Sequence, residues 1–373
     1  MGFLIFTTIE LVLYLVNSMI SFDKDRQKKI AAALMFAVFF IFAGLRGTGD
    51  ADYYNYLYFA KDIGTDLSKV FQLSYPVEIG FRISAFIFNS LGISRQAIII
   101  LMNLLSILPT AYIVLKESED PFLSAIIFMP IFIQFDMQTS RTASSIGLSF
   151  MAVYMIKDKK YIKGILFFLL SLSFHKSAVI ALPFFILIHM NLSYGFRIFA
   201  LGISFIISIL SKSFLRLGAQ ILSVIGLNTM STKILNYTFS GRFAQEMSFL
   251  DPRILFAIFL FITSILYYKK NEFKKMSIED ISIKAIWFAA VVLLVFRSST
   301  AIAFRFSNFF TVYQLIYMPM LLKRLKNKDP FVGFLVFLSV FVYILPYAIF
   351  LMAKAPAYGF FFTNKQAILS LKN

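Results

Sequence analysis

The stretch IAAALMFAVFFIFAGL, residues 30–45, runs for sixteen residues without a charged side chain. Apolar runs of this length suit the hydrocarbon core of a bilayer, and others lie at Gly2–Ile20 and Phe331–Phe350. Because such runs recur to the end of the chain, we interpret the first as a transmembrane helix and not as a cleaved signal peptide. The sequence therefore predicts an all-α, polytopic integral membrane protein, with residues 1–373 forming a single membrane domain.

The composition supports this class and excludes several others. The chain has 373 residues, of which 59% are hydrophobic and 15% are charged, whereas soluble domains carry about 25% charged residues. It has no cysteine, which excludes thiolate catalysis and disulfides, and two histidines are too few for a multi-histidine metal site. A net charge of +17 would suggest nucleic acid in a soluble protein, but here it reflects lysine-rich cytoplasmic loops, so no nucleic-acid partner is expected.

Lysine-rich segments determine the predicted topology, because cytoplasmic loops collect lysine and arginine. The segments placed inside are DKDRQKK (23–29), KDKKYIK (157–163), KKNEFKKMSIEDISIK (269–284) and LKRLKNKD (322–329). About twelve spans follow, near residues 2–21, 30–45, 96–115, 121–135, 142–156, 162–174, 177–190, 198–213, 253–268, 285–296, 306–321 and 331–350. Residues 77–92 carry Glu78 and Arg82 one turn apart, which favours a re-entrant or interfacial helix, and outer loops lie near 46–95 and 214–252.

Arginine does not follow lysine in this topology. Sixteen of the 24 lysines lie inside, but only three of the 12 arginines do. The arginines predicted outside are Arg46, Arg82, Arg95, Arg141, Arg216, Arg242, Arg253, Arg297 and Arg305. Because a guanidinium binds phosphate through a planar, bidentate fork, we expect several of them to form a pocket for an anionic group at the outer leaflet. The alternative is that individual arginines snorkel to lipid headgroups.

Ionisable groups other than arginine gather on the same predicted side. They are Asp50, Asp52, Glu78, Asp136, His175 and Asp251, whereas Glu10 falls within the first predicted span. Such groups are costly at membrane depth, so each is a hypothesis for function. For His175, the alternative is an interfacial histidine bonded to a backbone carbonyl.

Five motifs together resemble a known family. GLRGTGDADYYNY (44–56) is similar to the signature after the second helix of the EpsG-type exopolysaccharide polymerases, which belong with the Wzy-like O-antigen and capsule polymerases. The others are YPVEIGF with Glu78, SRTASSIGLSF with Arg141, SFHKSAVIALP with His175, and AFRFSNFF with Arg305. Their order and spacing agree with the family over roughly residues 1–320. The usual Gly-x-Asp becomes Gly49-Asp50-Ala51-Asp52, and Asp52 keeps the family's spacing from Arg46.

The resemblance implies a GT-C-like membrane glycosyltransferase that acts in O-antigen, capsule or exopolysaccharide synthesis. It would join undecaprenyl-diphosphate-linked oligosaccharide repeat units at the outer face of the bacterial cytoplasmic membrane, without a nucleotide sugar. Membrane lipid surrounds such an enzyme, and its expected protein partners are a flippase and a chain-length regulator.

The predicted chemistry assigns a role to each group of residues. Arg46, Arg141 and Arg305, with Arg297 and Arg242 in reserve, are expected to bind the diphosphate and stabilise its growing charge. Glu78, Asp52 and His175, in that order, are the candidates for the base that accepts the acceptor's proton. Tyr53, Tyr54 and Tyr56 offer flat faces to sugar rings, although tyrosines at this depth also form the interfacial aromatic belt.

No cofactor and no metal ligand is expected, because arginines can bind the diphosphate without a metal. Asp50-Ala51-Asp52 resembles the metal-binding pair of some glycosyltransferases, so a divalent cation is the alternative.

Other membrane functions remain open at this stage. A flippase or exporter of lipid-linked saccharide would also explain arginines that face an anionic lipid, but its ionisable groups should line a path through the midplane. An O-antigen ligase or another membrane transferase could share the arginine pocket, and only product analysis separates it from a polymerase.

Overall fold

The computed structural model describes residues 25–47, 52–240, 244–269, 272–354, 358–364 and 367. Three sequence predictions fall outside these ranges: the span at 2–21 with Glu10, the aspartate Asp50, and the reserve arginine Arg242. The described residues form helices, together with one isolated antiparallel bridge between Arg46 and Phe360. The protein is a helical membrane protein, as the apolar runs predict.

The chain divides into two compact units, Met1–Val179 with Met318–Asn373 and Ile180–Tyr317. We call them unit 1 and unit 2, and each is described by itself. The prediction of a single membrane domain stays a prediction.

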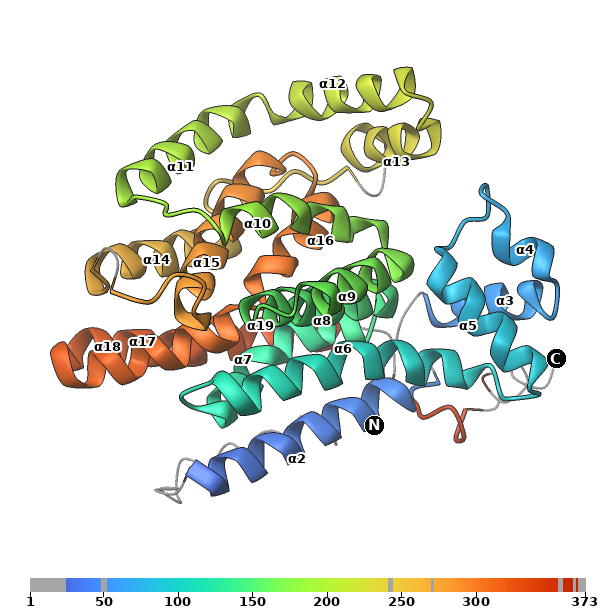
Figure 1. The fold of residues 1–373 in the computed structure, drawn as a ribbon, viewed down its shortest axis with the longest axis horizontal. Helices are drawn as coiled ribbons and strands as arrows, with labels where there is room; N and C mark the ends of the chain where they lie inside the picture. Colours follow the sequence, from blue (N-terminus) through green and yellow to red (C-terminus); the bar gives the residue numbers. More distant parts are fainter. Residues whose placement is uncertain are drawn as a thin grey trace. The chain divides into compact units, whose positions relative to one another are not determined.

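Unit 1 is built around helix α8, which packs against both α6 and α9 (Figure 1). Its elements up to the unit boundary are α2 (Asp25–Gly44), α3 (Tyr53–Ile63), α4 (Leu67–Phe71), α5 (Ile79–Ser90), α6 (Gln96–Glu117), α7 (Pro121–Ile131), a π-helix (Phe132–Asp136), α8 (Ser140–Lys157) and α9 (Tyr161–Phe174). The C-terminal part adds α18 (Pro330–Ser339), a π-helix (Val340–Ile344) and α19 (Leu345–Lys354), and α17 (Gln314–Lys328) crosses the boundary. Helices α3, α4 and α5 gather at one end of the unit, where α5 contacts both α3 and α9 (Figure 1).

Close backbone contact explains how α8 packs on α6. A Cβ atom on Gly147 would lie 2.5 Å from the carbonyl oxygen of Ser106 on α6. Glycine therefore lets the two helices approach more closely than any other residue would. The adjacent Ser144 donates a hydrogen bond of 2.8 Å to the carbonyl of Met102, which also joins α8 to α6.

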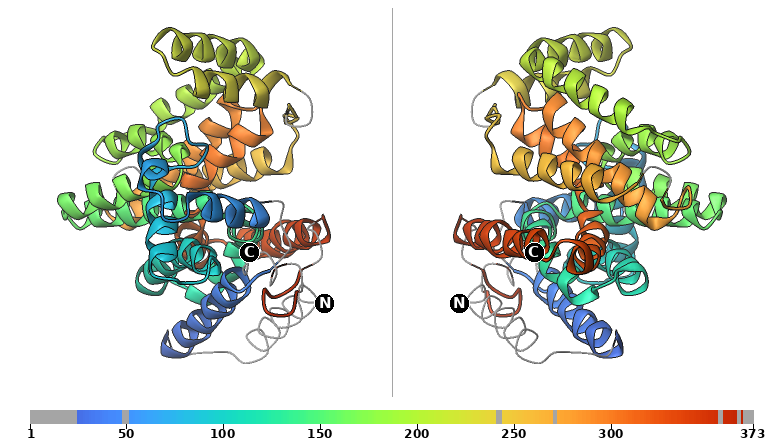
Figure 2. Two further views of the ribbon diagram at one scale, coloured as in Figure 1. Left: turned by 90° about the vertical axis from the view of Figure 1, so that its right-hand side faces the viewer. Right: turned by 90° about the vertical axis from the view of Figure 1, so that its left-hand side faces the viewer.

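Unit 2 contains seven α-helices among its described residues. They follow a 3-10 turn (Lys176–Ile180) and are α10 (Ala181–Leu187), α11 (Tyr194–Ile209), α12 (Ser211–Val224), α13 (Asn228–Phe239), α14 (Pro252–Tyr267), α15 (Ile278–Val295) and α16 (Thr300–Thr311). Helix α15 packs against α11, α14 and α16, and Phe288 on α15 meets Phe310 on α16 with ring centroids 4.7 Å apart. Helices α11 and α12 meet at a bend of 84°, and both views in Figure 2 keep α12 beside α13.

Most predicted spans coincide with helices, but only some helices have the length of a full span. Within the described residues, Arg26–Gly44, Gln96–Glu117 and Pro330–Ala353 are long and apolar enough to cross a membrane, and the bent pair α11–α12 would be a fourth. Shorter apolar helices include Pro121–Asp136, Tyr161–Phe174 and Pro252–Tyr267. The count of twelve spans and the GT-C classification therefore stay predictions.

Two segments differ from the expected pattern. The region 214–252, expected as an outer loop, contains most of α12 and all of α13, because Leu215 and Ala219 lie one turn apart and are buried. The predicted span 306–321 is two helices, since α16 ends at Thr311 and α17 begins at Gln314. The predicted re-entrant or interfacial segment 77–92 corresponds to α5.

Candidate functional site

Arg46 lies in the interior of unit 1. Its side chain is 0% exposed, and its guanidinium donates hydrogen bonds to the carbonyl of Ala43 at 2.8 Å and to Ser140 Oγ at 2.6 Å. The next residue, Gly47, is required by close approach, because a Cβ there would lie 2.3 Å from the Cα of Phe361. Backbone hydrogen bonds on both sides of the Arg46–Phe360 bridge hold this segment against residues 359–361. The arginine of the GLRG motif is therefore fixed by the surrounding chain.

Tyr53 is also part of the interior. Its hydroxyl donates to Gln96 Oε1 at 2.8 Å, and Gln96 Nε2 donates to the carbonyls of Gly44 and Arg46. These bonds tie α3 and α6 to the end of α2. Tyr54 is half-buried and packs edge-on against Tyr53, and its own hydroxyl has no hydrogen-bond partner among the described residues.

Glu78 and Arg141 form an ion pair that links α5 to α8. The Nη1 atom of Arg141 lies 2.5 Å from Glu78 Oε2, and the side chains are 20% and 9% exposed, respectively. Glu78 is the residue before α5, and Arg141 is the second residue of α8, so both belong to helix starts. The Nε atom of Arg141 has no hydrogen-bond partner among the described residues. Arg141 thus holds one carboxylate and keeps a further donor for another anion.

His175 and the segment after it complete the surroundings of Glu78. Burial alone would raise the pKa of Glu78, but in the acidic range where a glutamate titrates, His175 is protonated, and its charge together with that of Arg141 outweighs burial and holds the pKa below its usual value. The backbone N–H of Lys176 also points at Glu78 Oε1, at 3.5 Å. The Glu78 carboxyl is therefore an ionised carboxylate at neutral pH.

The hydrogen bond at Nδ1 of His175 assigns its tautomer. The backbone N–H of Ser177 donates to His175 Nδ1 at 3.1 Å, so Nδ1 is the acceptor in the neutral ring. The proton of the neutral imidazole then sits on Nε2. In this state His175 can donate a hydrogen bond through Nε2, and it is a poor acceptor of a substrate proton.

Asp52 and Tyr56 reach the same arginine from the start of α3. The guanidinium of Arg141 lies over the ring of Tyr56, 5.6 Å from its centroid, and the charge of Asp52 also acts on Arg141. Tyr56 donates its hydroxyl to Asp52 Oδ2 at 3.3 Å. Asp52 is half-exposed, whereas Tyr56 is buried. Asp52 is thus the more accessible of the two carboxylates near Arg141.

The remaining predicted arginines belong to unit 2. The guanidinium of Arg297 is ion-paired with Glu246 at 2.6 Å, donates to the carbonyl of Met247 and lies over Phe249. Arg305 is half-buried with its guanidinium 5.0 Å from the ring centroid of Tyr237, and no ion pair is seen for it in the part of the chain that the structure describes. Arg297 therefore pairs with a carboxylate that it shares with Lys212, whereas Arg305 has no ion pair among the described residues.

The predicted residues that converge are thus Asp52, Tyr56, Glu78, Arg141 and His175, which we call the Arg141 cluster. They come from four parts of the sequence and match the positions at which the motifs were recognised. Comparison with protein families matches the chain to the EpsG family over residues 29–364. The protein is a member of the EpsG family. Comparison with curated proteins and with solved structures gives no match.

Membership of the EpsG family indicates an exopolysaccharide polymerase-like role in a membrane. The motif residues of this EpsG protein divide into two groups. Glu78, Arg141, His175 and Asp52 face one another, whereas Arg46 is bound by backbone and serine. The family signature therefore combines residues of the cluster with residues that hold the chain in place.

Sequence reasoning missed Gln96 and the contacts of Ser140 and Asp136, although Asp136 was among the ionisable residues considered as hypotheses for function. Gln96 connects Tyr53 to two backbone carbonyls, and Ser140 accepts a hydrogen bond from Arg46. Asp136 is 0% exposed and lies close enough to Arg46 for their opposite charges to interact. Asp136 ends a π-helix, a feature that often occurs at functional sites. A charged residue next to an apolar run was visible in the sequence, but its pairing with a residue ninety positions away was not.

Within the described ranges, no group of three or more histidine, aspartate or glutamate side chains is arranged to hold a metal ion. Asp50 lies outside those ranges, so the Asp50–Asp52 pair stays an untested alternative.

Proposed function

We propose that this EpsG protein is a polysaccharide polymerase that joins lipid-diphosphate-linked oligosaccharide repeat units. The observation that carries this proposal is the Arg141 cluster, in which one guanidinium gathers Glu78, Tyr56 and Asp52 from distant parts of the sequence. A cation between carboxylates, beside aromatic and imidazole groups, suits the transfer of a sugar from an anionic leaving group.

Arg141 is the residue that we assign to the diphosphate. Its pairing with Glu78 fixes the guanidinium in position, and its unpartnered Nε leaves a donor for a phosphoryl oxygen. As the anomeric bond breaks, negative charge grows on the leaving oxygen. A guanidinium that is already oriented stabilises this charge without reorganisation during the reaction.

The transfer step balances as a nucleophilic displacement. The hydroxyl oxygen of the acceptor sugar forms a bond to the anomeric carbon of the donor, and the bond from that carbon to the diphosphate oxygen breaks. The leaving diphosphate takes the electron pair, and the hydroxyl proton passes to a base on the protein. We assign this base to Asp52, because its carboxylate is half-exposed and, among the described residues, accepts only the long 3.3 Å side-chain bond from Tyr56, whereas Glu78 is paired with Arg141.

The other predicted arginines receive different roles. We propose that Arg46 positions Ser140, and through it the adjacent Arg141, instead of contacting substrate itself. Of the two predicted diphosphate arginines described in unit 2, Arg305 is the better candidate for this ligand, because Arg297 is ion-paired with Glu246. Tyr54, with its unpartnered hydroxyl, is the tyrosine that we assign to saccharide.

We further propose that the cluster faces outward from a bacterial cytoplasmic membrane and that the donor lipid is undecaprenyl diphosphate. The lysine distribution supports the orientation, because the lysine-rich segments fall on the opposite side of the predicted topology. A flippase that delivers the donor and a chain-length regulator are the corresponding partners.

The test uses a bacterium that makes the matching glycan and lacks the gene for this protein. The deletion strain is complemented with wild type, Arg141→Lys, Arg141→Gln, Asp52→Asn and the control Arg26→Lys, an exposed arginine at the start of α2. Protein levels are matched, and surface glycan is resolved by size. We expect wild type and the control to restore long chains, and the Arg141 and Asp52 variants to leave single lipid-linked repeats on the outer leaflet.

Other outcomes would assign another function. Single repeats retained on the cytoplasmic leaflet of the deletion strain would indicate a flippase or exporter. Long chains that remain unattached to their final acceptor would indicate an O-antigen ligase. Normal chain lengths with Arg141→Gln at full protein level would contradict the assignment of the Arg141 cluster.

A further inference from the structure

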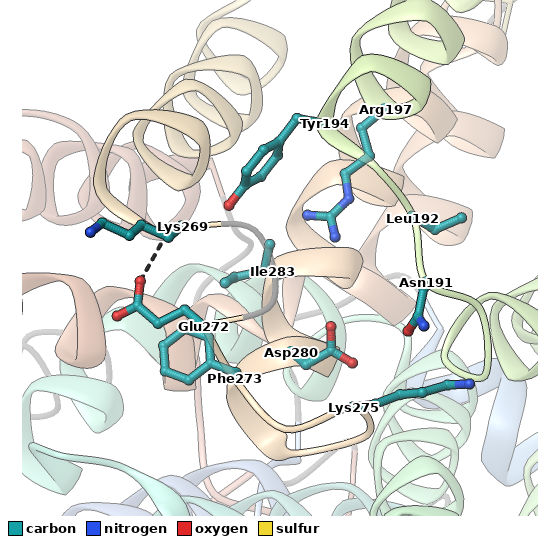
Figure 3. A pocket seen from close by; sticks show the side chains of 10 residues that line it. All are labelled: Asn191, Leu192, Tyr194, Arg197, Lys269, Glu272, Phe273, Lys275, Asp280 and Ile283. Atoms are coloured by element: carbon teal, nitrogen blue, oxygen red, sulfur yellow. Dashed lines mark hydrogen bonds between the residues drawn. The ribbon is translucent and has the colours of Figure 1, made fainter.

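A second charged site lies in unit 2, within a pocket of about 210 Å³ (Figure 3). The pocket is formed by the start of α11, by residues that follow α14 and by the first turns of α15. Its basic side chains are Arg197, Lys269 and Lys275. It is smaller than the roughly 300–1,000 Å³ of a pocket for a drug-sized ligand, so it suits one compact group.

Arg197 is a buried cation without a counter-charge in direct contact. The residue is 7% exposed, and its Nε and Nη1 atoms have no hydrogen-bond partner among the described residues. No ion pair is seen for it in the same ranges, and the aromatic ring beside it, that of Tyr194, has its centroid 5.5 Å from the guanidinium. Figure 3 shows the guanidinium projecting into the pocket, toward Asp280. Because a buried charge needs compensation, this arrangement calls for an anion.

The two acidic residues of the pocket balance its basic side chains only in part, although the charge of Asp280 does act on Arg197. Asp280 Oδ2 accepts hydrogen bonds from Lys284 Nζ at 2.8 Å and from the backbone N–H of Met276 at 3.0 Å. Lys284 is 1% exposed, so Asp280 already balances one buried cation. Glu272 is exposed and accepts from the backbone N–H of Lys269 at 2.8 Å. Arg197 and Lys275 therefore leave an excess of positive charge in the pocket.

We propose that this pocket binds a phosphate group, with Arg197 as the buried ligand and Lys275 at the rim. A guanidinium offers parallel N–H donors that match phosphoryl oxygens, and an ammonium at the rim adds attraction. The backbone of α11 supports this role, because the carbonyl of Arg197 accepts a hydrogen bond of 3.0 Å from Trp287 Nε1 on α15. This hydrogen bond holds the backbone of Arg197 in place, and so limits the positions that its guanidinium can take.

The phosphate could come from two sources that share this chemistry. The lysine-rich segment 269–284 is predicted inside, so the group is either the headgroup of an anionic inner-leaflet lipid or free phosphate from the cytoplasm. Neither source of phosphate takes part in the polymerase reaction. The proposal for this pocket therefore does not depend on the function proposed for the Arg141 cluster.

The test measures binding to the purified, delipidated full-length protein in detergent. The probes are phosphatidylglycerol, diacylglycerol with the same acyl chains, and inorganic phosphate. The proteins are wild type, Arg197→Gln, Lys275→Gln and the control Lys163→Gln, which removes an exposed lysine of unit 1. We expect Arg197→Gln to raise the Kd for phosphatidylglycerol or for phosphate at least tenfold, Lys275→Gln to raise it about threefold, and the control to leave it unchanged.

The outcomes separate the sources and can overturn the site. If the variants lose affinity for phosphatidylglycerol alone, the ligand is a lipid headgroup. If they lose affinity for inorganic phosphate, the ligand is a free anion. Should Arg197→Gln fail to fold, Lys275→Gln still tests the pocket, because its side chain is exposed. The proposal is overturned if both folded variants bind both anionic probes as wild type does, or if diacylglycerol binds as tightly as phosphatidylglycerol and inorganic phosphate does not bind.

Discussion

At the scale of single residues, Glu78 and Arg141 stabilise each other. Each is costly to bury alone, and their pairing offsets that cost. The pKa of Glu78 is lowered in the folded protein, so folding favours its ionised form. Its contribution to stability is therefore complete above the ordinary glutamate pKa of 4.5 and is lost as the pH falls through the lower, folded-state pKa.

Glu78→Gln should lower the free energy of unfolding by about 3 kcal/mol at neutral pH, because it leaves Arg141 without its counter-charge. The difference between wild type and variant should shrink as the pH falls below 4.5. Thermal unfolding of both proteins in detergent, over a pH series, measures this difference. Adding Arg141→Gln should recover part of the loss at neutral pH. A difference that does not change with pH would rule out the ion pair as its cause.

His175 allows its two ring nitrogens to be tested separately. In His175→Asn the side-chain oxygen can replace Nδ1 as acceptor for Ser177, whereas in His175→Gln the amide reaches the position of Nε2. We expect the asparagine variant to keep the unfolding temperature of wild type but to lose most polymer, and the glutamine variant to retain more polymer with lower stability. Glycan length and thermal unfolding, measured on the same preparations, check this. If the two variants lose polymer only in proportion to their loss of unfolding temperature, His175 has a structural role only.

At the scale of elements, the Arg141 cluster depends on how α5, α8 and α9 meet. Arg141 lies in the first turn of α8, Glu78 precedes α5, and His175 follows α9, so each side chain is positioned by a helix end. The Ser145 hydroxyl on α8 donates to the carbonyl of Ser171 on α9 at 3.0 Å, which ties the latter two helices together. A substitution outside the cluster that alters how these helices pack should therefore also disturb the geometry of the cluster.

Gly147→Ala tests the packing of α8 on α6. The new Cβ would meet the backbone of Ser106 at 2.5 Å, and backbone cannot move aside as a flexible side chain can. We expect a loss of about 1–3 kcal/mol in unfolding free energy, together with shorter glycan chains. The matched control is Gly202→Ala in α11, where a Cβ meets nothing within 4 Å and alanine should stabilise the helix slightly. Similar stability of the two variants would contradict the close approach of α6 and α8.

At the scale of the whole molecule, orientation in the membrane decides which leaflet the Arg141 cluster can serve. The arginine and lysine distribution predicts that residues 46–95 lie outside and that 269–284 lie inside. Because the chain has no cysteine, single cysteines can report accessibility without background.

Leu73→Cys and Lys275→Cys test this orientation, since Leu73 is 96% exposed and Lys275 is also exposed. A membrane-impermeant maleimide should label the first variant in intact spheroplasts and the second only after lysis. The reverse pattern would invert the topology and move the Arg141 cluster to the cytoplasmic leaflet.

The sequence by itself determined the class of the molecule, because long apolar runs have few solutions other than helices in a membrane. It also determined the family, since the motifs of EpsG proteins are local and can be recognised from order and spacing. The helix starts at Arg141 and after Glu78 were likewise predictable from these motifs.

Only the tertiary structure decided which motif residues meet. Arg46 and Arg141 look alike as arginines at helix ends, but Arg46 donates to a backbone carbonyl and a serine near the buried Asp136, whereas Arg141 pairs with Glu78. The burial of Tyr53, and the two Arg197 nitrogens that lack a hydrogen-bond partner among the described residues, were also invisible in the sequence. The physical reason is that charge balance and burial depend on contacts between residues far apart in the chain, which residue type and local spacing do not encode.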